Sequence, residues 1–353
     1  MNRPEIIIVT GAGGVGKTTL SAGIAAVIAQ RPARTLVITV DPARRLADAL
    51  GIAMTDRGTN RPTAVADAGS LDAVMLDVTA SWEAITRRHA TPEVADRLAD
   101  NPYFRAVADR FPAAQAYAAG EQVAEFAQSG NWDVLVVDTP PAEGGIDFFM
   151  APRRMRDLVG GRLLRWLTGA RIPGRRLFYR TAARPMLRLA DSLLGSALLE
   201  EIADFLLDLR TLYDGLAARA AAIDRLFGEA KVLVATTDSP GAMREAGRFF
   251  SSLPEIDTAP DALIFNRSLP DSWITARGPK GAGAEDAALR ENMARWSIEA
   301  RRNRDARHEM AARLAVPMAM VPWLRRSPTD ISGLADLIAR AEGLSAILES
   351  AAG

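Results

Sequence analysis

Apolar runs of strand length alternate with helix-like segments along most of the chain. Each run is short and rich in β-branched residues, Leu or Met, which suits a strand buried on both faces. The runs occupy residues 5–9, 35–40, 73–78, 133–137, 231–235, 261–265 and 317–321. This alternation predicts an α/β fold in which a mostly parallel sheet carries helices on both faces.

Two segments between these runs are too long to be simple crossovers. Residues 80–130 and 146–228 both have helix-like patterns. We therefore expect an inserted helical subdomain beside the sheet-containing core. The expected core comprises residues 1–79, 130–150 and 229–353, and the expected subdomain comprises residues 80–129 and 151–228.

Two features of the second long segment suggest a surface for a partner. Apolar residues recur at spacings of three and four from Leu198 through Phe205 to Phe227, which predicts one helix of roughly thirty residues. This stripe is either an ordinary core-facing stripe or the wall of a hydrophobic groove. Residues 153–188 carry eleven arginines and one acid, typical either of a solvated helix face or of a surface for an acidic partner or anionic membrane.

Composition narrows the chemistry. The chain has 43 basic and 43 acidic residues and no net charge, so we expect no nucleic-acid partner. The absence of cysteine excludes disulfides, thiol catalysis and thiolate metal sites. We see no charged-then-apolar leader and no apolar stretch of about 18 residues, so we expect no signal peptide, no membrane span and a cytoplasmic location.

A glycine-rich segment follows the first strand-like run and precedes a helix-like one. Residues 11–19 read GAGGVGKTT and satisfy the phosphate-binding pattern G-x-x-x-x-G-K-[ST] in its strand–loop–helix context. Such a loop turns successive backbone N–H groups around a polyphosphate, at the positive end of the helix. The predicted nucleotide-binding residues are Gly11, Gly13, Gly14, Val15, Gly16, Lys17, Thr18 and Thr19.

These residues have distinct expected roles. Lys17 would reach the β- and γ-phosphates of ATP, Thr18 would bind Mg²⁺, and Thr19 would touch the α-phosphate. Asp138 ends an apolar run and would be the Walker B carboxylate, which holds Mg²⁺ directly or through water. Asp41 ends another run and would orient the attacking water, so we take Asp41 and Lys17 as the catalytic residues. A strand-end Asp is otherwise commonly a helix cap.

The nucleotide base is less clearly marked. GTP-binding proteins commonly carry Asn-Lys-x-Asp or Thr-Lys-x-Asp after a late strand. Here the corresponding run is followed by Asn266, Arg267 and Ser268, without an Asp at that spacing. ATP is therefore favoured over GTP, and Asn266 is either a contact for the adenine edge or a turn-forming residue.

Together these motifs resemble the ArsA family, which comprises arsenite-pump ATPases and the guided-entry ATPases that deliver tail-anchored membrane proteins. The resemblance rests on residues 11–19, 41–46 (DPARRL), 138–141 (DTPP) and 266–267 (NR), and residues 147–154 (DFFMAPRR) look most like the actinobacterial anion-transporting branch. It implies a P-loop NTPase of the deviant Walker A class that works as a dimer with nucleotide near the interface. It also implies that Asp41 lies in switch I and that Asp138 begins switch II.

Two departures from the family pattern stand out. The family loop usually reads G-K-G-G-V-G-K-T, and its first lysine neutralises charge on the partner subunit's nucleotide. Here that position is Ala12, although a shortage of lysine alone would predict arginine. Three alternative outcomes are open: slow hydrolysis, replacement of the lysine by an arginine such as Arg44 or Arg45, or pairing with a lysine-bearing paralogue. The missing cysteines also exclude the family's Cys-x-x-Cys zinc clamp and its thiolate arsenite sensor.

We therefore predict a dimeric ATPase switch, slow unless activated, whose helical subdomain binds a protein client such as a hydrophobic membrane-protein segment. The dimer is either a homodimer or a heterodimer with a paralogue. Two alternatives stay open. One is a catalytically weak regulatory subunit of such a heterodimer, and the other is a surface-positioning ATPase of the cell-division or partition kind, with transient membrane-surface contact.

Overall fold

The computed structural model describes residues 3–40, 45–52, 60–65, 70–110, 112–140, 146–160, 205, 208–252, 258–280 and 283–349. The chain divides into two compact units. The first comprises Met1–Leu76, Glu125–Phe149 and Phe227–Gly353, and the second comprises Asp77–Ala124 and Met150–Leu226. Each unit is described separately below.

The first unit is built on one sheet. Its described strands are β1 (Glu5–Gly11), β2 (Thr35–Thr39), β3 (Thr63–Ala64), β4 (Leu71–Met75), β5 (Val134–Asp138), β6 (Lys231–Thr237), β7 (Ala262–Ser268) and β8 (Met318–Pro322). They lie in the order β3-β4-β2-β5-β1-β6-β7-β8. Within these strands only the β3–β4 pair is antiparallel. The predicted α/β fold with a mostly parallel sheet is confirmed.

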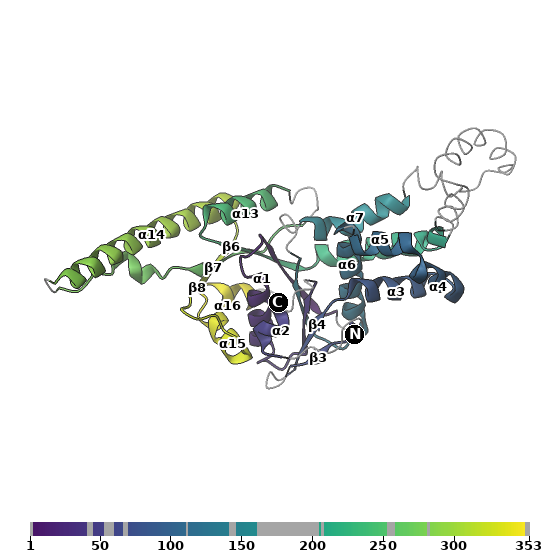
Figure 1. Ribbon diagram of the computed structural model, residues 1–353, viewed down its shortest axis with the longest axis horizontal. Helices are drawn as coiled ribbons and strands as arrows, with labels where there is room; N and C mark the ends of the chain where they lie inside the picture. The colour runs from purple at the N-terminus through teal and green to yellow at the C-terminus, as the bar shows by residue number, and fades with distance from the viewer. Residues whose placement is uncertain are drawn as a thin grey trace. The chain divides into compact units, whose positions relative to one another are not determined.

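Helices cover the sheet (Figure 1). On one face lie α1 (Lys17–Ile28), α2 (Arg45–Leu50), α15 (Ile331–Ala339) and α16 (Leu344–Glu349). Their apolar side chains form one buried cluster with alternate strand residues, such as Ile7, Val136 and Leu233. Towards the other face, α13 (Pro240–Ser252) contacts β1 and β6. The central strands are buried on both faces, which explains why they read as continuous apolar runs.

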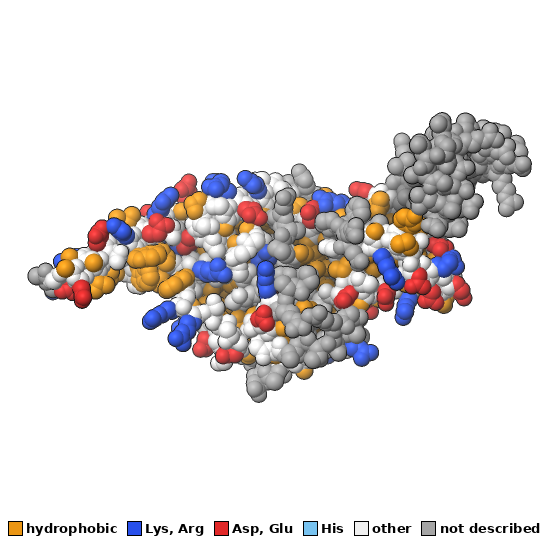
Figure 2. All heavy atoms as spheres, in the orientation of Figure 1, with side chains coloured by type: hydrophobic (Ala, Val, Ile, Leu, Met, Phe, Trp, Pro, Cys, Tyr) orange, Lys and Arg blue, Asp and Glu red, His pale blue; other side chains and the backbone are white. Residues whose placement is uncertain are grey.

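A long charged helix, α14 (Ala284–Leu314), is anchored to the sheet by one buried arginine. Arg307 is fully buried and donates to Asp238, just after β6, at 2.9 Å and to Asp271 at 3.0 Å. Asp271 begins the 3-10 helix η3 (Asp271–Thr275). Burial raises the pKa of Asp238, and the Arg307 guanidinium opposes that rise. Figure 2 shows acidic and basic side chains interspersed along α14, in keeping with the balanced charge of the chain.

The second unit is helical in its described part. It contains α3 (Val78–His89), α4 (Pro92–Asp100) and α5 (Pro102–Arg110), with parts of α6 (Pro112–Ser129), α7 (Ile146–Gly160) and α12 (Tyr213–Gly228). Trp82 packs against Phe104 and Tyr117, with ring centroids 5.7 and 5.8 Å apart. None of the helices that the structure describes combines the length and apolar character that crossing a membrane requires.

A buried ion pair network ties three helices of this unit together. Glu121 on α6 is 2% exposed and accepts hydrogen bonds from Arg88 on α3 and Arg219 on α12. Burial raises the pKa of Glu121, and the two guanidinium groups offset part of that rise. A buried carboxylate needs such partners because desolvation of an unpaired charge is costly.

Two sequence expectations about local structure are wrong. The run at residues 73–78 was expected to be a strand throughout, but α3 begins at Val78 because the Asp77 side chain accepts from the Ala80 N–H and caps the helix. The stripe from Leu198 to Phe227 was expected on one helix. A turn at Thr211 and Leu212 interrupts it before α12, with the Thr211 hydroxyl donating to the Asp208 carbonyl. Leu198 lies outside the described residues.

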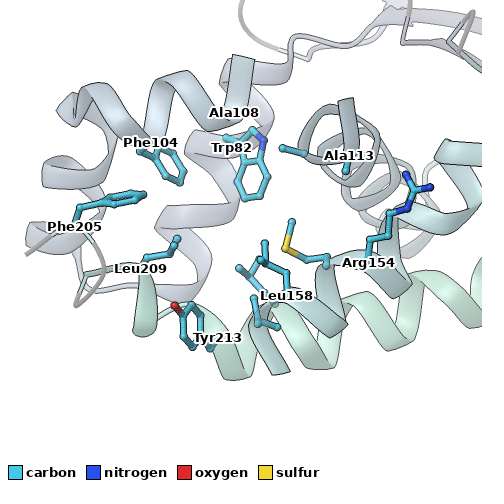
Figure 3. Close-up of a pocket in the computed structure, with 13 residues that line it drawn as sticks. Trp82, Phe104, Ala108, Ala113, Arg154, Leu158, Phe205, Leu209 and Tyr213 are labelled. Carbon is cyan, nitrogen blue, oxygen red and sulfur yellow. The ribbon is translucent and has the colours of Figure 1, made fainter. Parts of the chain in front are cut away.

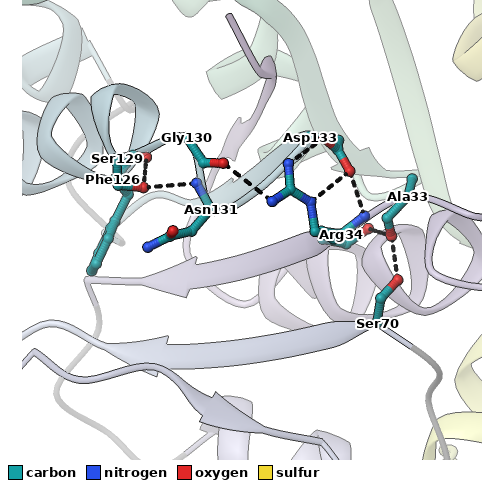
Figure 4. A network of polar contacts seen from close by, with 9 residues as sticks. Ala33, Arg34, Ser70, Phe126, Ser129, Gly130, Asn131 and Asp133 are labelled. Atoms are coloured by element: carbon teal, nitrogen blue, oxygen red, sulfur yellow. Dashed lines mark hydrogen bonds and ion pairs between the residues drawn. The ribbon is translucent and has the colours of Figure 1, made fainter. Parts of the chain in front are cut away.

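At the amino edge of the sheet, Arg34 joins the chain segments that enter β2 and β5 (Figure 4). Its guanidinium donates to both carboxylate oxygens of Asp133, at 2.7 and 3.1 Å, and to the Gly130 carbonyl at 3.1 Å. The Arg34 backbone N–H also donates to Asp133. Hydrogen bonds from Arg34 hold the pKa of Asp133 at about 2, below its ordinary value. Both side chains are about half exposed, so salt weakens the pair.

We expect Asp133→Asn to lower the midpoint of urea unfolding at pH 7 and low salt. The stabilisation from a carboxylate with a lowered pKa is complete above the unfolded value, about 3.9, and is lost as pH falls towards 2. The difference between wild type and variant should therefore narrow below pH 4 and in high salt. A difference that stayed constant with pH and salt would contradict this assignment.

Candidate functional site

The segment between β1 and α1 forms a tight loop at the carboxyl edge of the sheet. Gly11, Gly14 and Gly16 have positive φ values of 142, 78 and 91°, which favour glycine. A Cβ atom on Gly11 would lie 2.1 Å from the Ala235 carbonyl oxygen on the adjacent β6. The backbone therefore reaches this close approach only because the residue is glycine.

The loop delivers backbone N–H groups to the start of α1. Gly16 is the N-cap residue and no side chain caps the helix. The first N–H groups of a helix have no partner within it, and the helix dipole makes this end positive. The loop and helix start thus have the polarity that favours a phosphate group.

Lys17 carries the one ammonium group in residues 11–19. The side chain is 7% exposed, and its Nζ donates to the carbonyls of Gly11 and Ala12, at 2.9 Å each. These contacts hold the charge beside the first two carbonyls of the loop, where an incoming phosphate oxygen would be an alternative acceptor. The Ala12 side chain is 4% exposed and belongs to the buried apolar cluster beneath the loop.

Asp138 and Thr18 lie together, although 120 residues separate them in the chain. The strand register places Asp138 beside Val9 on β1 and beside Thr39 on β2. Oδ2 of Asp138 accepts from the Thr18 hydroxyl at 2.7 Å and from the Thr39 hydroxyl at 2.9 Å. Asp138 is 1% exposed. The sequence analysis did not identify Thr39 as a partner of Asp138. Its position at the end of a strand that pairs with β5 is the signal that would have identified it.

A carboxylate and a hydroxyl at this spacing are oxygen donors that suit Mg²⁺. No cluster of three His, Cys, Asp or Glu side chains able to hold a metal occurs within the described part of the chain. Mg²⁺ keeps several waters and commonly binds through one carboxylate plus substrate phosphates. The Thr18–Asp138 pair fits that mode, with the remaining ligands coming from phosphate and water.

Of the other residues that the sequence analysis named for the site, some lie at the loop and others lie outside the described residues. Asn266, near the carboxyl end of β7, donates from Nδ2 to the Val15 carbonyl at 2.8 Å. Arg267 donates to the Gly14 carbonyl at 3.4 Å. Residues 11–19, Asp138 and Asn266 therefore lie together at one edge of the sheet. Asp41, Arg44 and residues 141–145 lie outside the described residues, and Arg45 begins α2 with an exposed side chain.

Comparison with known proteins identifies the family to which the chain belongs. The family model described as anion-transporting ATPase (ArsA ATPase) matches residues 4–278. The chain is 34% identical over 144 residues to protein Rv2184c of Mycobacterium tuberculosis, covering 38% of the chain and 34% of that protein. It is 23% identical over 285 residues to the putative arsenical pump-driving ATPase 1 of Aquifex aeolicus, covering 76% and 65%.

A third relative is the ATPase ASNA1 homologue of Plasmodium vivax, 27% identical over 154 residues, which cover 44% of the chain and 38% of that protein. The chain thus spans between 34% and 65% of the length of these three relatives.

If Asp138 holds Mg²⁺ as the sequence predicts, we expect Asp138→Asn to reduce Mg²⁺-dependent ATP binding by about tenfold or more, because the charged ligand would be lost. The amide oxygen can still accept from the Thr18 and Thr39 hydroxyls, so the fold should persist. Titration calorimetry with ATP in Mg²⁺ and in EDTA measures the effect. Asp133→Asn, at the other end of β5, is the matched control. Equal Mg²⁺ dependence in wild type and Asp138→Asn would contradict the assignment.

Proposed function

Because the chain belongs to the anion-transporting ATPase family, we propose that it binds ATP with Mg²⁺ at the loop of residues 11–19 and hydrolyses it as a nucleotide-driven switch. The observation that carries this proposal is the convergence of Lys17, Thr18 and Asp138 at the carboxyl edge of the sheet. A buried ammonium and a carboxylate there supply charges of the sign that a Mg-triphosphate needs, and the hydroxyl supplies a neutral oxygen ligand for Mg²⁺.

Each residue of the site has a role in the proposed reaction. Lys17 exchanges the carbonyls of Gly11 and Ala12 for oxygens of the β- and γ-phosphates. Thr18 and Asp138 hold Mg²⁺, which neutralises charge developing on the phosphates. Asp41, which follows β2 in sequence, orients the attacking water. The loop amides donate to the phosphates and cost no reorganisation during the reaction, because the fold already fixes them.

The proposed switch connects this site to the helical unit through the chain itself. Residues 139–145 join Asp138 on β5 to α7 along the chain, and α7 from Met150 onward belongs to the second unit. Binding of the γ-phosphate and Mg²⁺ beside Asp138, and their release after hydrolysis, would act through this connection on the start of α7. The proposed assembly is a dimer, either of two copies or with a paralogue.

The helical unit offers a place for an apolar client segment. This unit contains a pocket of about 450 Å³. Figure 3 shows Phe205 and Leu158 among the side chains that line it. Nearly all of its lining is apolar, and Leu158 is 56% exposed at its edge. The residues that line it are Trp82, Phe104, Ala108, Ala113, Ala114, Arg154, Met155, Leu158, Val159, Phe205, Leu209, Tyr213 and Leu216. An accessible apolar pocket of this size suits side chains of a hydrophobic segment.

A second candidate function is that of a regulatory subunit that binds nucleotide and acts through a lysine-bearing paralogue. The observation that favours it is Ala12, whose buried methyl group supplies no cation to a partner's nucleotide. Turnover separates the two proposals, because only the first requires hydrolysis by the isolated chain.

We expect Lys17→Ala to reduce steady-state ATP hydrolysis by about 100-fold or more, because the charge facing the transferred phosphoryl group is lost. Phosphate release by the isolated chain measures it, and far-UV circular dichroism checks the fold. Lys280→Ala, which changes an exposed lysine, is the matched control and should keep wild-type turnover. Nucleotide binding without turnover in the wild type would favour the regulatory subunit, and unchanged turnover in Lys17→Ala would contradict the proposed site.

We expect Leu158→Asp to weaken capture of a fluorescent, alanine- and leucine-rich helical peptide by about tenfold, because a carboxylate at the pocket edge would have to be desolvated. Leu158 is exposed, so the fold should tolerate the change. Leu289→Asp on α14 is the matched control, since Leu289 is 52% exposed. Fluorescence anisotropy with ATP and Mg²⁺ measures capture. Equal peptide affinity in the two variants would count against the pocket as the client site.

A further inference from the structure

Two neighbouring strands, β2 and β5, each end on a polar side chain of the same face. Side chains two residues apart along a strand point to the same face of a sheet. Val37 on β2 and Val136 on β5 belong to the buried cluster that also contains side chains of α1. Thr39 and Asp138 lie two residues further along these strands. They therefore lie on the face that α1 covers, at the edge where α1 begins.

The Thr39 hydroxyl is buried and needs a polar partner. Thr39 is 0% exposed, and a buried hydroxyl without a hydrogen bond costs free energy that a valine of nearly the same shape would avoid. The strand register sets Thr39 directly beside Asp138, and the hydroxyl donates to Oδ2 of Asp138 at 2.9 Å. Valine would meet the packing, so this hydrogen bond is a contribution of threonine that packing does not require.

Oδ2 of Asp138 accepts from two hydroxyls that come from different elements. Thr18 donates from the first turn of α1 at 2.7 Å, and Thr39 donates from the end of β2 at 2.9 Å. The torsion that sets the plane of an Asp carboxylate is broad when nothing holds it. Two donors on separate backbone elements hold one oxygen in place and so restrict that torsion.

The two donors differ in what they do at the proposed metal site. Thr18 is itself a proposed ligand of Mg²⁺. Thr39 is fully buried, so it acts on a bound metal through Asp138. Residues that hold a metal ligand in this way change metal affinity without touching the metal.

We propose that Thr39 is a positioning residue of the metal site, which holds the Asp138 carboxylate in the orientation that Mg²⁺ requires. This inference rests on the proposed binding of ATP with Mg²⁺ at residues 11–19, and it adds a residue that touches neither nucleotide nor metal. The Thr39 hydroxyl strengthens binding of the metal-bound nucleotide. It leaves binding of metal-free nucleotide unchanged, because Lys17 and the loop amides contact phosphate without it.

The test is titration calorimetry of Thr39→Val with ATP, once in Mg²⁺ and once in EDTA. The Kd for ATP in Mg²⁺ should rise by about tenfold, because the carboxylate loses one of the donors that orient it. The Kd in EDTA should stay at the wild-type value. Thr39→Ser keeps the hydroxyl and should restore most of the Mg²⁺-dependent affinity.

Thr35→Val is the matched control, because it removes a hydroxyl from the other end of the same strand. Thr35 is also 0% exposed, and its hydroxyl donates to the Ala33 carbonyl at 3.2 Å. This variant should bind ATP in Mg²⁺ as wild type does. Thermal unfolding without ligand checks the fold of each variant. Thr39→Ser and Thr39→Ala differ by one hydroxyl, so this pair gives the same comparison if Thr39→Val does not fold.

A spectroscopic readout measures the metal without turnover. Electron paramagnetic resonance of Mn²⁺ titrated into protein with ADP should show weaker Mn²⁺ binding in Thr39→Val than in Thr35→Val. Unchanged Mg²⁺-dependent affinity in Thr39→Val would overturn the proposal. An equal loss in Mg²⁺ and in EDTA would also overturn it and make Thr39 a structural residue. Failure of the proposed function is a different result, because wild type would then show no Mg²⁺-dependent nucleotide binding.

Discussion

The close approach of β1 to β6 at Gly11 is the constraint on which the proposed nucleotide site depends. The Gly11 Cα lies where any side chain would meet the Ala235 carbonyl, so the chain can leave the sheet here only as glycine. The turn that follows starts α1 at Lys17 and brings its ammonium back over the carbonyls of Gly11 and Ala12. The parallel register then sets Asp138 beside the same turn.

The sequence predicted the parts of this arrangement that depend on local pattern. Buried strands read as apolar runs, and the glycine-rich loop is recognisable because its backbone geometry demands particular residues at fixed spacing. The contacts made between neighbouring strands could not be predicted from such local patterns. Thr39 joins Asp138 through the pairing of β2 with β5, and strand order cannot be read from one chain.

The two errors about local structure have local causes. The run at residues 73–78 has the composition of a strand to its end, but the Asp77 side chain competes for the Ala80 N–H and starts α3. The stripe up to Phe227 keeps a helical period through Thr211 and Leu212, where the backbone makes a turn. Periodicity indicates which side chains face the core. A helix interrupted by a turn can keep the same side chains facing the core, so the period alone does not show that the helix is continuous.

The family match and the buried Ala12 together shape the functional account. In the proposed site, Lys17 and Asp138 supply the charges and Thr18 a neutral oxygen for one Mg-triphosphate within a single chain, whereas Ala12 supplies no cation to a second one. The most direct test is titration calorimetry of the folded wild-type chain with ATP in Mg²⁺. The account predicts saturable binding of one ATP per chain, weakened when EDTA removes Mg²⁺. A chain that unfolds cooperatively and yet binds no nucleoside triphosphate would contradict it.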